Sequence, residues 1–274
     1  MIVTSNDKLQ SANNAFLEFF NIQSVEEFNK IHDCIAKLFV PNNGFFILSD
    51  AIGDECWTDY LFHHSEVVRI VSIMDLNNQM IDFELTIKKI ESESEYIIVF
   101  NDITQFIARK NEYKYFAYHD HLTKIYNRQR FDELFLKEVE NKRRYEDHLS
   151  ILLLDIDHFK KVNDTYGHYI GDLTLIALTK LISKDLRIND IFARWGGEEF
   201  IILLPRTDID AAYTKAQEIR TMVESHVNKE LPSITVSIGV TEMNNSDTTK
   251  TCLQRVDKAL YLSKEKRNDV VKVI

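Results

Sequence analysis

Short apolar stretches separated by polar residues run along most of this chain, and each predicts a strand or a helix. The stretch from Ser150 to Ile156 is apolar as far as Asp155, which is typical of a buried central strand. The stretch 234–240 alternates apolar with small residues and predicts a strand covered on one side. Two further apolar stretches, 191–195 and 200–204, flank a Gly-Gly pair and predict a β-hairpin.

Helical spacing of apolar residues appears in two places. One follows Asp172, where a single helical face predicts a long helix packed on the core. That face carries Leu175, Leu178, Leu181 and Ile182. The other is a shorter stretch whose residues recur at three- and four-residue steps and predict a coiled-coil-like seam. The seam consists of Ile103, Phe106, Lys110, Tyr113 and Ala117. A plain linker helix is the alternative, but a short helix with one stripe gains stability by pairing, which favours a dimerising connector.

The first hundred residues predict a small sheet with a helical flank. We expect strands over 66–73, 80–87 and 97–100, the last of which ends the domain. Such a fold can enclose a ligand, and Cys56-Trp57 and His63-His64 are conceivable neighbours of a haem or flavin. Packing or surface roles are favoured for these residues, so any prosthetic group in this part of the chain is unknown.

Length, charge and cysteine content narrow the function classes. With 274 residues the chain can form two modest domains, each with a core. The formal net charge of −10 disfavours a surface for a phosphate backbone, so a nucleic acid polymer is not an expected partner. Three scattered cysteines favour reduced thiols and a cytoplasmic location. No apolar stretch has the length of a membrane span, so we expect a soluble chain, with a missing upstream segment left open.

Three carboxylates are placed where they require a cation. Asp155 ends the predicted buried strand, and a desolvated carboxylate is costly without a partner. Glu198 and Glu199 follow the two glycines of the hairpin, which permit a sharp turn where a side chain would clash, and adjacent carboxylates repel each other. A shared Mg²⁺ relieves both costs and, because it favours phosphate oxygens, predicts a nucleoside triphosphate. An ordinary polar hairpin tip is the alternative for the Gly-Gly-Glu-Glu sequence taken alone.

The carboxylates belong to a longer series of motifs that resembles the GGDEF family, the diguanylate cyclases, in its GGEEF form. The series spans about 120–268. Its parts are Asp120-x-Leu122-Thr123 with Asn127-Arg128, the run from Asp155-x-Asp157-x-Phe159-Lys160 to Gly171-Asp172, Gly196-Gly197-Glu198-Glu199-Phe200, and Arg255 to Tyr261. Two departures are Lys124, where a Gly is usual, and the segment Ser263 to Asn268, which is one residue short and lacks its Gly.

The resemblance implies an α+β fold, the palm-like nucleotidyl cyclase, and condensation of two GTP into cyclic di-GMP with release of pyrophosphate. It implies two Mg²⁺ ions per active site, with Mn²⁺ as a possible substitute. The implied metal ligands are Asp155, the Ile156 carbonyl, Glu198 and Glu199. Glu199 either holds the second metal or accepts the hydroxyl proton, and Glu198 and Lys160 complete the implied catalytic group.

The resemblance also assigns residues to the substrate. Backbone N–H groups at Phe159 and Lys160, together with the Lys160 charge, would contact the phosphates. Asn163 and Asp172 would read guanine, since a carboxylate accepts from donors that adenine lacks; helix capping is a compatible alternative. Lys264 and Arg267 would reach the terminal phosphates, with a solvated helix end as the alternative and their register unsettled.

A product-binding inhibitory site is implied by an R-x-x-D motif, Arg187 to Asp190. Five residues, Ile191 to Trp195, separate this motif from the hairpin glycines, as in the family. An ordinary surface ion pair between Arg187 and Asp190 is the alternative, and such pairs stabilise a protein little.

The N-terminal part resembles a PAS domain. Ile2-Val3-Thr4, Ser5-Asn6-Asp7 and the segment 9–16 resemble its opening hairpin and first helix, and Asn101-Asp102-Ile103-Thr104 resembles the junction to a following module. The expected organisation is a PAS-like sensory domain over 1–102, a connector helix over 103–119 and a cyclase domain over 120–274. Because each cyclase domain binds one GTP, we expect a homodimer through the PAS-like domain and connector.

Three functions compete on this sequence. The first is an active, sensor-regulated diguanylate cyclase, which the intact Asp155, Glu198 and Glu199 favour. The second is a catalytically silent receptor that binds cyclic di-GMP through Arg187 and Asp190. The third is a cyclase for another nucleotide, against which Asn163 and Asp172 argue.

Overall fold

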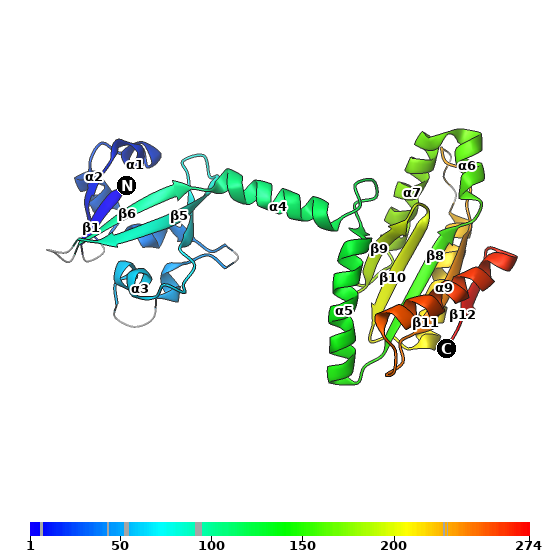
Figure 1. Ribbon diagram of the computed structural model, residues 1–274. Helices are drawn as coiled ribbons and strands as arrows, with labels where there is room; N and C mark the ends of the chain where they lie inside the picture. Colours follow the sequence, from blue (N-terminus) through cyan, green and yellow to red (C-terminus); the bar gives the residue numbers. More distant parts are fainter. Residues whose placement is uncertain (6–7, 43, 52–54, 91–94, 227, 229) are drawn as a thin grey trace. The chain divides into compact units, whose positions relative to one another are not determined.

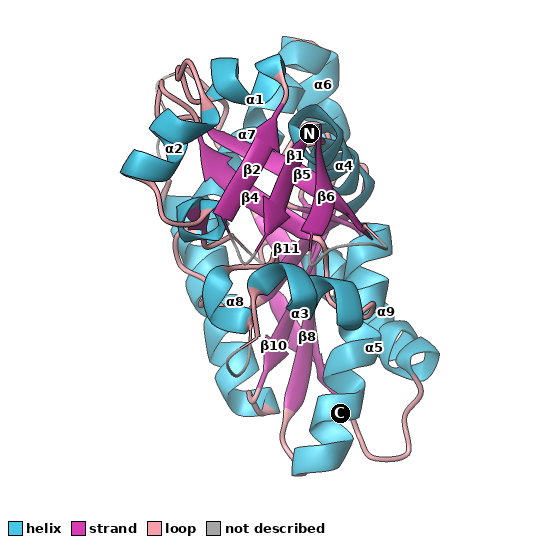
Figure 2. Cartoon of the chain, turned by 90° about the vertical axis from the view of Figure 1, so that its left-hand side faces the viewer, coloured by secondary structure: helices cyan, strands magenta, loops and turns pink. Residues whose placement is uncertain are grey.

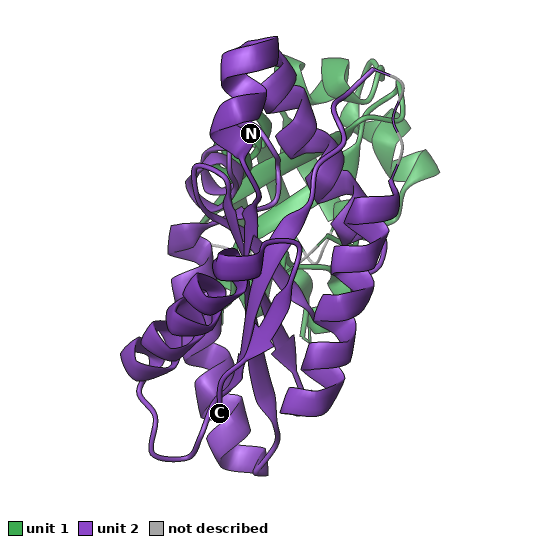
Figure 3. Ribbon diagram, turned by 90° about the vertical axis from the view of Figure 1, so that its right-hand side faces the viewer, with its two compact units in different colours: residues 1–112 green, residues 113–274 purple. Residues whose placement is uncertain are grey.

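The structure is a computed structural model that describes residues 1–5, 8–42, 44–51, 55–90, 95–226, 228 and 230–274. The chain divides into two compact units, Met1–Glu112 and Tyr113–Ile274, which are coloured separately in Figure 3. Each unit has its own sheet and its own apolar core. The division falls within helix α4 (Thr104–Tyr118).

The first unit is built on an antiparallel sheet with the strand order β2-β1-β6-β5-β4-β3, among the magenta strands of Figure 2. The strands are β1 (Ile2–Ser5), β2 (Lys8–Ala12), β3 (Phe39–Val40), β4 (Ile70–Met74), β5 (Met80–Lys89) and β6 (Glu95–Asp102). The helices are α1 (Asn14–Phe19), α2 (Val25–Ile31) and α3 (Trp57–His63), with short 3-10 turns at Ile35–Leu38 and Leu48–Asp50. Side chains from helices and strands share one core, in which Trp57 is only 1% exposed.

The strand expectations for this unit are mostly met. Strands cover 80–87 and 97–100 with slightly wider bounds. The expected strand over 66–73 is wrong at its start, because the chain becomes extended only at Ile70 and Val68 is exposed in the preceding loop. Asn6 and Asp7 of the expected opening hairpin lie outside the described residues.

Helix α4 confirms the helix expected between the two sequence regions. None of its residues is buried. Two apolar side chains of the predicted seam are open to solvent, with Phe106 66% and Tyr113 73% exposed, whereas Ile103 is half-buried. The exposed part of the seam is therefore not covered by the described part of a single chain.

The second unit is built on a mixed sheet with the order β12-β11-β8-β10-β9-β7, which places β8 near the centre. The strands are β7 (Tyr126–Asn127), β8 (Leu149–Ile156), β9 (Ile191–Gly196), β10 (Glu199–Pro205), β11 (Val236–Glu242) and β12 (Val270–Lys272). The helices are α5 (Arg128–Tyr145), α6 (Phe159–Tyr166), α7 (His168–Ser183), α8 (Ile209–Ser225) and α9 (Thr249–Lys266). This is the expected α+β arrangement.

Helices cover both faces of that sheet. Side chains of α6, α7 and α8 pack with Leu152, Leu154 and other residues on one face. Side chains of α5 and α9 pack with Ile151 and Leu153 on the other face, and α9 crosses in front of the sheet in Figure 1. Because both faces are covered, every residue of β8 is buried, which explains its nearly continuous apolar sequence.

The predictions for this unit from apolar periodicity are confirmed with adjusted ends. The hairpin strands and the central strand form, and β11 begins at Val236 rather than at residue 234. The long helix begins at His168, so Asp172 lies inside α7 instead of before it. Leu175, Leu178 and Ile182 are buried on its core face, as the spacing predicts.

Candidate active site

The three carboxylates come together at one edge of the sheet. Asp155 is the penultimate residue of β8, and Glu199 opposes it directly in the antiparallel register of β8 and β10. Glu198 lies in the turn between β9 and β10, and its carbonyl oxygen accepts a hydrogen bond from the Ile156 N–H at 3.4 Å. The hairpin therefore folds its tip over the end of the central strand.

The two hairpin glycines have a different role from the one expected. Gly196 pairs with Glu199 at the end of β9, and neither Gly196 nor Gly197 has a positive φ. A Cβ added at Gly196 would lie 3.8 Å from Glu199 Oε2, and one at Gly197 would meet no atom within 4 Å. The expectation that a side chain would clash within the turn is therefore wrong. The glycines instead leave open space over the hairpin tip, which lets a ligand approach the backbone closely.

The electrostatics of this edge favour a bound cation. Asp155 is 8% exposed, and burial raises the pKa of its carboxyl, while the Lys264 ammonium opposes the shift from 2.8 Å away. Burial also raises the pKa of the Glu198 carboxyl, and the charges of Asp155 and Glu199 raise it further. Burial thus disfavours the charged forms of Asp155 and Glu198, and the nearby Lys264 ammonium partly offsets this effect.

The donor set suits a hard divalent cation. Carboxylate and carbonyl oxygens are the ligands that Mg²⁺ and Mn²⁺ accept, and the raised pKa values of Asp155 and Glu198 show that their charged forms are disfavoured in the protein alone. In the described part of the chain no three acidic, histidine or cysteine side chains are already assembled as a metal cluster. The Lys264 ammonium lies 2.8 Å from a carboxylate oxygen of Asp155.

Arg194, on β9, braces the hairpin. Its Nε and Nη2 donate to the Gly197 carbonyl oxygen at 3.0 and 2.7 Å. Its Nη1 donates to both carboxylate oxygens of Asp120 at 3.1 and 3.2 Å, and Thr123 also donates to Asp120. Asp120 lies two residues after α4, so the end of that helix and the hairpin turn are joined through one guanidinium group.

The start of α6 faces the same edge of the sheet. Phe159 and Lys160 are its first residues, and the first N–H groups of a helix have no acceptor within it. Phe159 is buried, whereas Lys160 is exposed, which suits the expected backbone and charge contacts to phosphates. These residues directly follow the strand that carries Asp155, so the carboxylate and the helix start lie a few residues apart.

Asn163 and Asp172 lie on α6 and α7, respectively, and neither caps a helix. The N-cap positions of these helices are His158 and Gly167, without side-chain hydrogen bonds. A Cβ at Gly171 would lie 1.9 Å from Asn163 Oδ1, so Gly171 makes room for the amide. Asp172 is exposed on the next position of α7. The capping alternative is therefore wrong, which leaves both polar groups available to a ligand.

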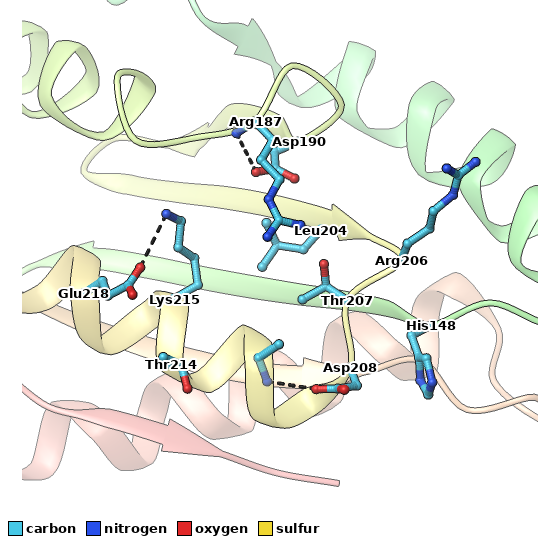
Figure 4. A pocket seen from close by; sticks show the side chains of 11 residues that line it. His148, Arg187, Asp190, Leu204, Arg206, Thr207, Asp208, Thr214, Lys215 and Glu218 are labelled. Carbon is cyan, nitrogen blue, oxygen red and sulfur yellow. Dashed lines mark hydrogen bonds and ion pairs between the residues drawn. The ribbon is translucent and has the colours of Figure 1, made fainter.

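The expected inhibitory pair lines a pocket on another part of the unit. A cavity of about 450 Å³ is bordered by Arg187, Asp190, Arg206 and Lys215 among others. The Asp190 carboxylate accepts from the Arg187 backbone N–H at 2.8 Å, and burial raises its pKa. No ion pair joins the two side chains among the described residues, and the Arg187 guanidinium extends beside Leu204 (Figure 4). The alternative, an ordinary surface ion pair between Arg187 and Asp190, is therefore wrong.

Three functional candidates escaped the sequence analysis. Arg194 stands out only as a charged residue in an apolar strand, and Asp157 only as the second Asp of an Asp-x-Asp motif. Asp157 is 6% exposed and accepts from Thr235 and Ser237 side chains, both at 2.7 Å, so it anchors β8 to β11 and the loop before it. Asn268, the third candidate, donates its backbone N–H to Asp157 at 2.8 Å.

Comparisons with known proteins show similarity over the second unit. A family model described as "Diguanylate cyclase, GGDEF domain" matches residues 117–269. The chain is 37% identical over 176 residues to diguanylate cyclase DgcM of Escherichia coli (strain K12), covering 64% of this chain and 43% of that protein. It is 35% identical over 203 residues to diguanylate cyclase A of Treponema denticola, covering 69% of this chain and 54% of that protein.

A solved structure shows the same similarity. The coiled coil and GGDEF domain of DgcB from Caulobacter crescentus, in complex with c-di-GMP, matches with a TM-score of 0.59 and 30% identity. That match covers 62% of this chain and 93% of the DgcB chain. The chain spans about half the length of the two curated relatives, with 43% and 54% of them covered. In the described residues no helix is both long and apolar enough to cross a membrane.

Proposed function

The chain belongs to the GGDEF diguanylate cyclase domain family, and from this premise we propose that it condenses two GTP molecules into cyclic di-GMP and releases pyrophosphate. The observation that carries the proposal is the meeting of Asp155, Glu198 and Glu199 at the end of β8, beside the start of α6. A desolvated carboxylate cluster next to free helix N–H groups suits a metal-bound triphosphate.

The chain's own residues have separable roles in this proposal. Asp155, Glu198, Glu199 and the Ile156 carbonyl would hold Mg²⁺ or Mn²⁺, and the bound ion would neutralise phosphate charge. The first N–H groups of α6 and the Lys160 ammonium bind phosphate oxygens. Glu199 either holds the second metal or accepts the proton of the attacking ribose hydroxyl. Lys264, once released from Asp155, is free to contact phosphate together with Arg267.

Guanine selectivity rests on Asn163 and Asp172. Neither side chain is used in helix capping, and Gly171 keeps space beside the Asn163 amide. A carboxylate at Asp172 accepts from the guanine N1–H and 2-amino groups, whereas adenine presents no such pair of donors. A nucleotide lacking these donors leaves the carboxylate unpaired and binds more weakly.

Control of the activity is assigned to the first unit and the helix that follows it. The strand order β2-β1-β6-β5-β4 and the short helices on the shared core support a PAS-like sensory domain over 1–102. The exposed seam of α4 supports a connector over 103–119 that pairs two chains. Since one cyclase domain, 120–274, binds one GTP, pairing brings two loaded domains together.

Product inhibition is assigned to the pocket at Arg187 and Asp190. Its cationic side chains suit the phosphates of cyclic di-GMP, and the Asp190 carboxylate suits guanine donors. The pocket residues are separate from the carboxylate cluster, so the product can bind without occupying the GTP site.

Replacement of Glu199 tests the proposal. Glu199→Gln keeps the size and hydrogen-bonding atoms of the side chain but removes the charge needed by a metal ligand or proton acceptor. Turnover of GTP should fall roughly a hundredfold or more, while GTP binding measured by calorimetry should persist. Glu140→Gln, an exposed position on α5, is the matched control and should keep normal turnover. Near-normal turnover in Glu199→Gln would contradict the proposed mechanism.

A further inference from the structure

The backbone at Arg267 is in a conformation that side chains rarely adopt. Arg267 caps the end of α9 with φ 59° and ψ 160°, and its N–H donates to the Ser263 carbonyl oxygen at 2.9 Å. This region of φ and ψ is essentially restricted to glycine, and a residue with a Cβ is strained there. The next residue, Asn268, also has a positive φ of 44°. The sequence thus places an arginine where the turn itself favours glycine.

A network of hydrogen bonds holds this turn. The Asn268 N–H donates to Asp157 Oδ2 at 2.8 Å, and Asp157 is in turn fixed by Thr235 and Ser237. The Asn268 side chain accepts from Arg220 Nη1 at 3.0 Å and donates to Glu224 Oε1 at 2.7 Å. Arg220 and Glu224 are themselves an ion pair at 2.9 Å on α8. The turn is therefore tied to the end of β8, to the residues around the start of β11 and to α8.

The strained residue ends the helix that contacts the candidate active site. Arg267 is exposed, and it lies three residues after Lys264 in the sequence. Lys264, one turn earlier on α9, contacts Asp155 directly. Backbone strain persists only where the surrounding structure over-determines it, and Asp157 and Asn268 provide that restraint.

We propose that Asn268 and Asp157 are positioning residues that hold the strained Arg267 backbone, so that its guanidinium faces the triphosphate of GTP. The inference rests on the proposed function and extends it, because it assigns the strain to substrate binding. A glycine at position 267 would relieve the backbone strain but remove the guanidinium. The protein would therefore become more stable and bind the nucleotide more weakly.

The Arg267→Gly variant of the full chain tests both effects, on stability and on nucleotide affinity. Scanning calorimetry should show the unfolding midpoint of the cyclase unit rising by about 2–4 °C, because the strain is relieved. Binding of a non-hydrolysable GTP analogue with Mg²⁺ should weaken roughly tenfold. The matched control is Glu146→Gly, since Glu146 caps α5 with a φ of 53° away from the carboxylate cluster. That variant should gain stability with unchanged nucleotide affinity.

Asn268→Ala separates positioning from general stability. In the wild-type background it should weaken binding of the GTP analogue roughly tenfold. In the Arg267→Gly background it should weaken binding no further, because the group that it positions is absent. Should the alanine variant unfold, Asn268→Asp, which keeps an acceptor for Arg220, serves in the same cycle.

The outcomes distinguish this inference from the proposed function. A lowered midpoint in Arg267→Gly, unchanged affinity in that variant, or additive losses in the double variant would each overturn the positioning role. Absence of cyclic di-GMP formation by the wild-type chain would instead contradict the proposed function. The midpoint and analogue-binding measurements need no turnover, so they still decide the positioning role in that case.

Discussion

At the scale of single residues, the candidate site contains carboxyl groups whose ionisation is unfavourable before ligands bind. Burial raises the pKa of both Asp155 and Glu198, and the charge of Asp155 raises the pKa of Glu198 further. Lys264 compensates Asp155 at 2.8 Å, but Glu198 has no ion pair among the described residues. Such an electrostatic cost is expected at a site where a bound cation supplies the compensating positive charge.

Replacing Glu198 by glutamine should therefore stabilise the metal-free protein. The pKa of Glu198 is raised in the folded state, so folding favours its protonated form, and stability is lost as the pH rises through that raised pKa. Glu198→Gln removes this loss. We expect a higher unfolding midpoint than wild type at neutral pH, in the presence of a chelator, and a difference that shrinks as the pH falls to about 4.

Thermal unfolding across that pH range provides the measurement, with Glu140→Gln as a control that should shift nothing. A stability difference independent of pH would show that the effect comes from packing rather than from the Glu198 charge.

The residues found by sequence reasoning are those whose role is local. Asp155, Glu198 and Glu199 follow from a buried strand and a turn, both visible in neighbouring residues. Arg194 and Asp157 act through partners far along the chain, with the Arg194–Asp120 contact spanning 74 residues and the Asp157–Asn268 contact 111. No periodic pattern in the sequence links two positions so far apart, so these contacts become visible only in the folded structure.

At the scale of elements, apolar patterning predicted the strands and helices that position the site. Strand β8 was visible because both of its faces are buried, and α7 because one face is. The ends were less certain, since the polar residues that begin α7 do not interrupt the helix and Asp172 lies within it. The turn of the hairpin was placed correctly, but the reason for its glycines was not visible without the surrounding atoms.

Replacing Arg187 tests whether the pocket at Arg187 and Asp190 binds cyclic di-GMP. Arg187→Ala removes a cation from the pocket but leaves the Asp190 carboxylate, which accepts from the backbone N–H at position 187 in either protein. We expect the affinity for cyclic di-GMP to fall at least tenfold, in line with the loss of charged hydrogen bonds, while initial rates with GTP stay near wild type.

Titration calorimetry with cyclic di-GMP measures this directly. Lys184→Ala, at the exposed end of α7, is the matched charge-removing control. Equal product affinity in Arg187→Ala and wild type would mean that the inhibitory site is misassigned.

At the scale of the whole molecule, the two units are joined by α4, whose apolar stripe is open to solvent. The helix itself was predictable from spacing, but its pairing was not, because a seam on a single chain does not identify its partner. Hydrogen bonds from Arg194 to Asp120 and to the Gly197 carbonyl join the residues after α4 to the hairpin turn.

A charged substitution on the seam of α4 tests whether this helix pairs two chains. Phe106 is 66% exposed, and Phe106→Glu should weaken dimerisation because a carboxylate is costly to bury at an apolar interface. Specific activity should then depend more steeply on protein concentration. Sedimentation and activity across a dilution series measure both effects, with Gln105→Glu as the charge control at the neighbouring exposed position. Unchanged mass and activity in Phe106→Glu would show that α4 is only a linker.

The central claim is that this chain makes cyclic di-GMP from GTP. The most direct measurement is to incubate the purified chain with GTP and Mg²⁺ and to identify and quantify the products by mass spectrometry, with parallel reactions containing ATP or a chelator. The account predicts cyclic di-GMP with two pyrophosphates per molecule, formed only from GTP and only with the metal. Binding of added cyclic di-GMP without any synthesis, or equal turnover of ATP, would contradict it.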